Sequence, residues 1–104
     1  MRRVFNADLE TAYRFFNKRY FGNRLPKDMV VRFENIRELG KTYSFCERPL
    51  YILINRKIAW HGMLVEMTLL HEMVHVENTK AGHGPWFHKR MLRLAKAGAF
   101  RNSW

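Results

Sequence analysis

The chain has 104 residues, enough for one hydrophobic core, so we expect a single domain over residues 1–104 without a separate regulatory module. Hydrophobic residues make up 47% of it and aromatic residues 14%, which excludes a disordered segment, and the one cysteine, Cys46, excludes a cysteine-based zinc finger or ribbon. Nineteen Lys and Arg against nine Asp and Glu give a formal net charge of +10, so a polyanion is the first partner to expect.

The stretch ADLETAYRFFNKRYF near the amino end predicts a helix. Asn6 can cap this helix, and acidic residues follow in its first turn, where they favour the helix dipole. The helix should end near Gly22 and Asn23, which both tolerate the left-handed backbone of a helix end. Its inward face should carry the apolar residues at helical spacing, Leu9, Ala12, Tyr13, Phe16 and Tyr20.

Three β-rich runs follow the turn LPKD, namely MVVRFENI, KTYSFC and YILINRKI. They predict a small, mainly antiparallel three-stranded sheet. Apolar residues alternate with polar ones in each run, so one face of each strand should point to the core. The inward pairs should be Val31 with Phe33, Tyr43 with Phe45, and Ile52 with Ile54.

The chain returns to helical spacing from about His61 to Asn78, with apolar residues on nearly every side. This segment should be the buried central helix, with only Glu66, Met73 and Glu77 in an outward stripe. A last helix should start at Pro85, a favourable first-turn residue, and stop at Gly98. The fold class is therefore α+β, a sheet packed on a central helix with flanking amino- and carboxyl-terminal helices.

The motif HEMVH, residues 71 to 75, predicts a zinc site. His71 and His75 lie about 40° apart on one helix face, and Glu72 lies at its edge, so two imidazoles can bind one ion while the carboxylate acts on a ligand of it. The motif could also arise by chance, but unpaired histidines and a glutamate on a buried helix would be costly to desolvate. His61, about 15 Å of helix away, should be a surface or terminus residue.

A catalytic zinc needs a third protein ligand. No acidic residue follows Glu77, and the extended pattern HExxHxxGxxH fails at Asn78 and Ala81. Two histidines remain downstream. We favour His83, because the turn AGHGP can bring it back over the zinc helix, and we keep His88 as the alternative, since it lies inside the last helix.

With these motifs the chain resembles the SprT-like family. The resemblance rests on FNKRYFGNRLP, then short strands, then HEMVH, then HGPWF, and it runs from about Leu9 to Leu94. It implies a zincin-like fold, zinc on His71, His75 and His83, and Glu72 as the general base. For Spartan-like members it also implies cleavage of proteins trapped covalently on DNA.

Two departures from the family pattern stand out. The interval from His75 to His83 is shorter than is usual in the family, which brings the chain nearer to other minimal metallopeptidase families such as WLM. These 104 residues contain no zinc-ribbon cysteines, and we expect no partner-binding tail, so DNA recruitment should depend on the basic surface of the domain itself.

A basic face on the last helix is the expected DNA contact, single-stranded or at junctions. The alternative is a merely solvated charged face. The candidate residues are Lys89, Arg90, Arg93 and Lys96, with Arg101 beyond the helix.

Two functions from different classes therefore compete. One is a monomeric zinc endopeptidase acting on DNA-bound or DNA-crosslinked proteins, with an extended or unfolded substrate along the KTYSFC edge strand. The other is a basic nucleic-acid-binding module with a structural or vestigial zinc. The segment MRRVFNADLE has no apolar stretch of a secretory signal, so we expect a cytoplasmic protein without membrane contact, associated with the nucleoid or placed in the nucleus.

Overall fold

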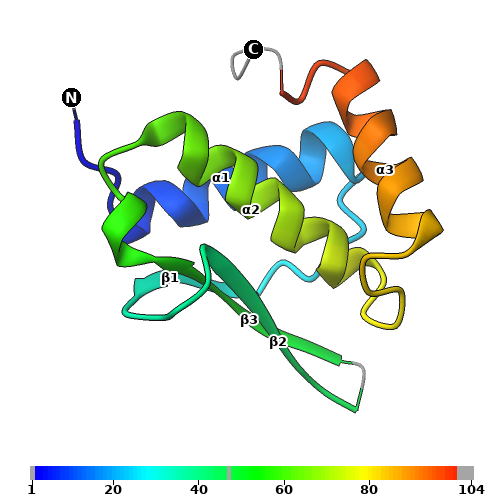
Figure 1. Cartoon of the computed structure of the whole chain (residues 1–104), viewed down its shortest axis with the longest axis horizontal. Helices are drawn as coiled ribbons and strands as arrows, with labels where there is room; N and C mark the ends of the chain where they lie inside the picture. The colour runs from blue at the N-terminus through cyan, green and yellow to red at the C-terminus, as the bar shows by residue number, and fades with distance from the viewer. Residues whose placement is uncertain (1, 47, 101–104) are drawn as a thin grey trace.

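Three helices and a three-stranded sheet make up the computed structural model, which describes residues 2–46 and 48–100 (Figure 1). The expected α+β class is confirmed. In chain order the elements are α1 (Asn6–Tyr20), β1 (Val30–Glu34), β2 (Gly40–Phe45), β3 (Arg48–Asn55), the short 3-10 helix η1 (Arg56–Ile58), α2 (Gly62–Glu77) and α3 (Pro85–Lys96).

The sheet is mixed, so the prediction of a mainly antiparallel sheet was wrong for its first strand. The strand order is β1-β3-β2, with β2 antiparallel to β3 and β1 parallel to β3. The segment 35–39 carries the chain past the central position, which β3 then fills, so β1 and β2 do not form a hairpin. The strand KTYSFC is consequently an edge strand, as expected.

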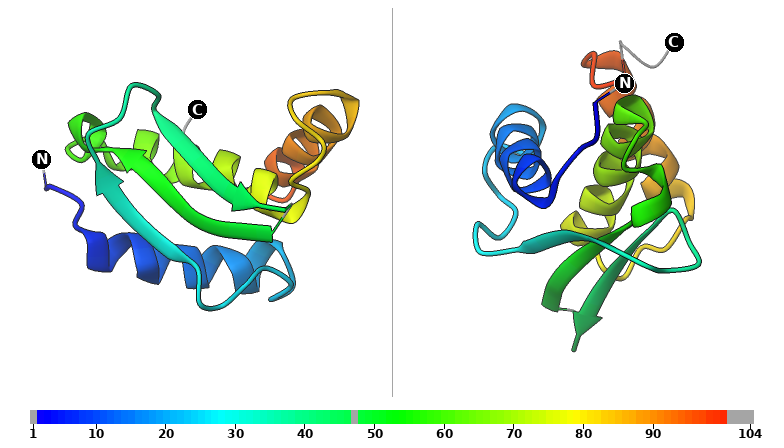
Figure 2. Two further views of the ribbon diagram at one scale, coloured as in Figure 1. Left: turned by 90° about the horizontal axis from the view of Figure 1, so that it is seen from below. Right: turned by 90° about the vertical axis from the view of Figure 1, so that its left-hand side faces the viewer.

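Helices α1 and α2 cover one face of the sheet, and α3 packs against α2 (Figures 1 and 2). The core lies between these layers, and the inward pairs of β1 and β3 are buried there: Val31, Phe33, Ile52 and Ile54. The pair predicted on β2 was wrong in part. Phe45 is 71% exposed, because it lies at the far end of the β2–β3 hairpin, which extends beyond the helices (Figure 1).

Helix α2 is the buried central helix, as expected, and half of its residues are buried. The predicted outward stripe was wrong at Met73, which is fully buried, whereas Glu66 is exposed and Glu77 half-buried. The sheet, α1 and α3 all contact α2 and cover its buried side. His61 lies at its start, where its Nδ1 accepts a hydrogen bond from the Leu64 amide at 3.1 Å.

The start of α1 differs from the expectation in one residue. The cap position is Phe5, whose amide donates to Asp8 Oδ2 at 2.8 Å, and the Asn6 side chain instead accepts a hydrogen bond from the Phe33 amide on β1. Asn6 thus joins the helix to the sheet. The helix ends before Gly22 and Asn23, which both have positive φ, as predicted.

The motif FNKRYFGNRLP is explained by the turn after α1. The buried Asn17 side chain exchanges two hydrogen bonds with the Leu25 backbone, donating to its carbonyl at 3.0 Å and accepting from its amide at 3.1 Å. The Tyr13 hydroxyl donates to the Pro26 carbonyl at 2.6 Å. These bonds satisfy backbone groups that no helix or strand pairs.

Among residues 2–46 and 48–100, none of the helices has the length and apolar character needed to cross a membrane.

Candidate metal centre

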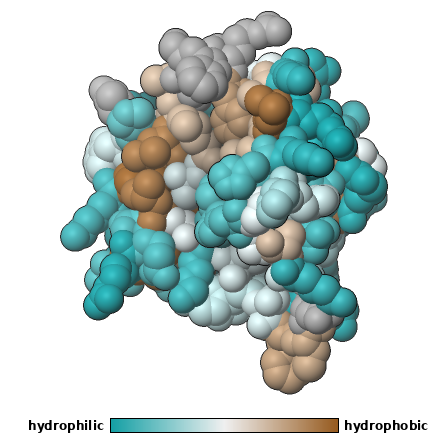
Figure 3. Space-filling view, turned by 45° about the vertical axis from the view of Figure 1, so that its right-hand side comes forward, coloured by the Kyte–Doolittle hydropathy of each residue, from teal (hydrophilic) through white to brown (hydrophobic). Residues whose placement is uncertain are grey.

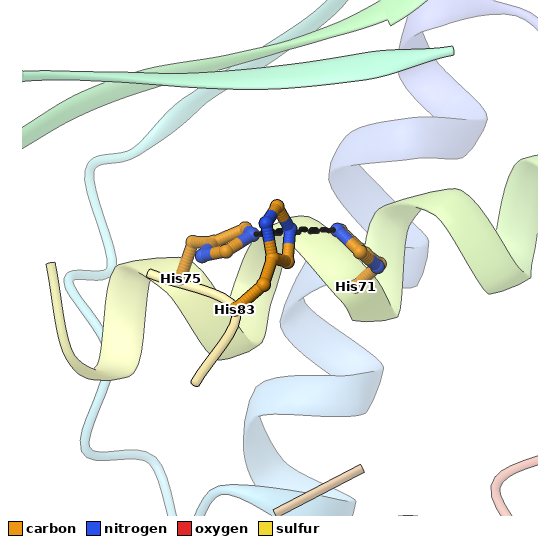
Figure 4. A group of neighbouring side chains, drawn as sticks. All are labelled: His71, His75 and His83. Carbon is orange, nitrogen blue, oxygen red and sulfur yellow. Dashed lines mark hydrogen bonds between the residues drawn. The ribbon is translucent and has the colours of Figure 1, made fainter. Parts of the chain in front are cut away.

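Three histidines converge on one point beside α2 (Figure 4). His71 and His75 project from consecutive turns of the helix, and their Nε2 atoms lie 3.3 Å apart. The loop between α2 and α3 turns back and brings His83 Nε2 to 3.2 Å from that of His71 and 3.0 Å from that of His75. Gly82, with φ of 58°, makes the sharp turn that directs His83 inward.

This arrangement fits a tetrahedral zinc ion. With Zn–N distances of roughly 2.0–2.1 Å, neighbouring ligand nitrogens of a tetrahedron lie about 3.3 Å apart, close to the three separations found here. Within residues 2–46 and 48–100, no cysteine or carboxylate joins the three histidines as a fourth member of the cluster. A site with three protein ligands leaves one coordination position for water or substrate, as in catalytic zinc sites.

The surroundings favour the neutral form of the two helix histidines, His71 and His75. Burial, together with the neighbouring His75 and His83, lowers the pKa of His71 to about 4. Burial and His83 likewise lower the pKa of His75. Neutral imidazoles are the form that binds a metal, so the nitrogens are available at neutral pH.

The buried ring of Phe87 supports all three histidines. Its centroid lies 4.8 Å from that of His71, 4.7 Å from that of His75 and 4.9 Å from that of His83. Phe87 belongs to the HGPWF segment of the family resemblance, but helical spacing alone does not predict its contact with the imidazoles. It fixes the ring orientations from the α3 side.

Glu72 is 5% exposed and lies beside the cluster, with Oε2 at 3.9 Å from His71 Nε2. Its other oxygen, Oε1, accepts a hydrogen bond from the Thr42 hydroxyl at 2.9 Å. Burial raises the pKa of the Glu72 carboxyl, and the bond from Thr42 opposes that rise. No cation pairs with this carboxylate among the described residues, so Glu72 can exchange a proton with a neighbouring water.

Gly40 allows β2 to approach Glu72. A Cβ atom there would lie 2.6 Å from Thr68 Cγ2 and 3.2 Å from Glu72 Oε2, so any side chain would collide with α2. Sequence reasoning missed both Gly40 and Thr42, because their role depends on how β2 lies across the helix. The resulting cleft of about 290 Å³ has the three histidines and Glu72 on one side and the β2 residues Gly40, Lys41, Thr42 and Ser44 on the other.

The carboxyl end of α2 carries a second polar cluster of a different kind. Glu77 accepts a hydrogen bond from Arg90 Nε at 2.6 Å and another from Arg24 at 2.9 Å. Arg90 also donates to the Tyr20 carbonyl at 2.9 Å and lies over the Phe21 ring. This cluster joins the ends of α1 and α2 to α3.

The predicted DNA contact at Arg90 is therefore wrong, since only 9% of this residue is exposed. It follows Phe87 by three residues and precedes Leu94 by four, which places it on the buried face of α3. Lys89, Arg93 and Lys96 are exposed, as expected. Arg101 lies outside the described residues.

The remaining histidines lie apart from the cluster. His88 is exposed on α3 and does not belong to the group that could hold an ion, so of the two downstream candidates the structure brings His83 to the helix pair. His61 is an exposed residue at the start of α2, as expected.

The model of the SprT-like family fits residues 9–103, nearly the whole chain. No solved structure matches the chain.

Proposed function

The chain belongs to the SprT-like family, and from this premise we propose that it is a zinc-dependent endopeptidase. Membership supports a metalloprotease-like domain, and the family is usually zinc-dependent. The observation that carries the proposal is the convergence of three imidazoles beside a buried glutamate that has no cationic partner among the described residues. The zincin-like fold implied by the resemblance is part of the same proposal.

The residues of the cleft have distinct tasks in this reaction. His71, His75 and His83 would hold the ion, which when bound supplies a Lewis acid for the scissile carbonyl and for the attacking water. Glu72 accepts the proton that the water loses as its oxygen bonds to the carbonyl carbon. It then gives that proton to the amine nitrogen as the C–N bond breaks. Thr42 holds the Glu72 carboxylate toward the cleft.

The edge strand β2 supports an extended or unfolded protein as substrate. One edge of β2 pairs with β3, and the strand lines the metal cleft through Lys41, Thr42 and Ser44. A substrate backbone can extend the sheet along such an edge and bring a peptide carbonyl to the histidines. Compact folded proteins cannot supply a free strand of this kind.

DNA association is the second part of the proposal, and the substrates would be proteins bound or crosslinked to DNA. The net charge of +10 supports it, as do Lys89, Arg93 and Lys96, which are exposed on α3 and form no ion pair with any described acid. The competing function is a basic nucleic-acid-binding module whose zinc is structural or vestigial. The three-ligand cluster and the cleft beside it favour the enzyme, because a structural zinc is normally closed by a fourth protein ligand.

The test is Glu72→Gln, an isosteric change that removes the base and leaves the ligands in place. The purified variant should keep its zinc and fold, and it should cleave an unstructured protein roughly two to four orders of magnitude more slowly than the parent. Both proteins are assayed with and without single-stranded DNA. Equal rates for parent and variant would end the protease proposal in favour of the binding module.

A further inference from the structure

An apolar groove of about 710 Å³ runs between α2 and α3 and ends at the metal cleft. Each helix contributes one stripe of residues spaced three or four apart, which is the spacing of a single helix face. On α2 these are Leu64, Met67, Thr68 and His71, and on α3 they are His88, Met91, Leu92 and Ala95. Gly40, His71 and Glu72 line both the groove and the metal cleft, so the two are continuous.

The groove leaves large apolar side chains uncovered. Leu92 is 57% exposed, Leu39 51% and Met67 40%. Figure 3 shows patches of apolar surface on the side where α3 comes forward, between hydrophilic side chains. Exposed apolar surface that continues into a polar reaction centre is typical of a ligand site.

The chemistry of the lining selects the occupant. Apart from Glu72, His71 and His88, the lining residues carry no ionisable group, and most of them are apolar. Methionines at positions 67 and 91 can adjust to apolar groups of different shape. A charged or strongly polar group against the leucines and methionines of the groove would lose its hydration without gaining a partner there.

We propose that this groove binds a large apolar side chain of the polypeptide substrate, next to the bond that is cut. The inference rests on the proposed function, and it adds a specificity for leucine, methionine or phenylalanine beside the scissile bond. A backbone lying along β2 with one carbonyl at the histidines passes Gly40 and Glu72, where the groove begins. The neighbouring side chain on that side then points between α2 and α3.

The experiment compares two zinc-binding probes on the zinc-loaded full chain by isothermal titration calorimetry. Acetohydroxamate reports the metal alone, and 3-phenylpropionohydroxamate adds a phenyl group that can enter the groove. The phenyl probe should bind roughly tenfold more tightly or better, because burial of its ring removes apolar surface from water. Equal affinities would overturn the inference while leaving the zinc site intact, whereas failure of both probes to bind would remove the proposed function itself.

Two variants test the walls. Leu92→Glu places a charge at the exposed rim of the groove, and Met67→Gln is a milder change on the opposite helix. Each should abolish most of the phenyl advantage and leave acetohydroxamate binding unchanged. The matched control is Phe15→Glu on α1, where an apolar residue of 59% exposure lies outside the groove lining. A phenyl advantage that survives both wall variants would contradict the proposal.

The sequences of the cleavage products provide a third test of the proposed specificity. Mass spectrometry of an unfolded protein digested by the parent should show leucine, methionine and phenylalanine enriched on one side of the cut bond, and Leu92→Glu should reduce that enrichment. A chain with residues 101–104 removed is compared in parallel. If the parent shows no phenyl advantage and this shortened chain does, the groove is occupied by the chain's own end, and the substrate assignment fails.

Discussion

Glu72 and Glu77 lie five residues apart on the same helix, yet they have opposite surroundings. Glu77 is paired with two arginines, at 2.6 Å and 2.9 Å. Glu72 is more deeply buried and has a single threonine hydroxyl as its hydrogen-bond donor. Burial accordingly raises the pKa of Glu72. Glu77, which joins three helices, has its charge compensated, whereas Glu72, the proposed general base, does not.

The comparison also explains the distribution of basic residues. The protein has 19 Lys and Arg, but the side-chain hydrogen bond to Glu72 comes from a hydroxyl, and the paired arginines on this helix lie at Glu77. A cation beside Glu72 would stabilise the ionised carboxylate and weaken it as a base. On the proposed function, Glu77 stabilises the fold and Glu72 takes part in the reaction. Substitutions at these two positions of α2 should therefore have different consequences.

The largest effect is expected from the histidines. His71→Ala, His75→Ala or His83→Ala should each weaken zinc binding by roughly two orders of magnitude or more, measured by competition with a chromogenic chelator. Zinc at about a thousand times its dissociation constant should stabilise the parent by about 4 kcal/mol, and a variant that binds zinc a hundredfold more weakly should keep only about 1.4 kcal/mol of this stabilisation. His88→Ala is the control. If it weakened zinc binding more than His83→Ala, the third ligand would be wrongly assigned.

The two glutamates should separate in unfolding experiments on the metal-free chain. Glu77→Gln should lower the free energy of unfolding by about 3 kcal/mol, because it leaves the largely buried Arg90 without its partner. Glu72→Gln should leave it within about 1 kcal/mol of the parent, since it removes an unpaired buried charge. Urea denaturation followed by circular dichroism measures both. The reverse order would break the division between a structural and a reactive glutamate.

A substitution at Gly40 tests how closely β2 packs against Glu72. Gly40→Ala should lower the free energy of unfolding by about 1–3 kcal/mol, because the new methyl group must displace Thr68 and Glu72. Gly62→Ala is the matched control, since nothing lies within 4 Å of a Cβ there, and it should be neutral or stabilising by up to about 1 kcal/mol. Equal effects at the two positions would show that β2 does not crowd the glutamate.

The smallest effect on stability is expected on the outer face of α3. Exchanging Lys89, Arg93 and Lys96 together for Glu should change the unfolding free energy by no more than about 0.5 kcal/mol per site. It should nevertheless reduce the salt dependence of single-stranded DNA binding by about two units of log K per log salt. Arg90→Ala should do the opposite and destabilise the fold with the slope unchanged. If DNA binding showed no salt dependence, the prediction would fail, and Lys89, Arg93 and Lys96 would form only a solvated charged face.

Much of the site could be predicted because it is local in the sequence. The spacing of His71 and His75 within one helix defines their relative positions. The loop after that helix is short, so His83 must lie close to the end of the helix. Arg90 could have been placed correctly as well, since helical spacing from Phe87 and Leu94 puts it on the buried face. That error came from grouping residues by charge before applying the helical period.

Other features depend on contacts between distant segments. The parallel pairing of β1 with β3 follows from the path of residues 35–39, for which the strand pattern gives no rule. Gly40 and Thr42 matter only because β2 crosses α2 at Glu72. The apolar groove needs two helix faces to meet, and its α3 stripe would be taken in isolation for an ordinary core face.

The Glu77–Arg90 ion pair has a consequence for the loop that carries His83. The ion pair holds residues 77 and 90 together, so both ends of the loop between α2 and α3, the tether, are fixed in position. His83 lies in this loop, and its imidazole is therefore kept at a high effective concentration beside those of His71 and His75. Closure entropy grows only logarithmically with length, by about 0.6 kcal/mol for each doubling of the tether. Residues inserted between Asn78 and Gly82 would therefore cost little zinc affinity while the ion pair holds. For the proposed zinc site, we therefore expect the affinity to depend more on how firmly this loop is anchored than on its exact length.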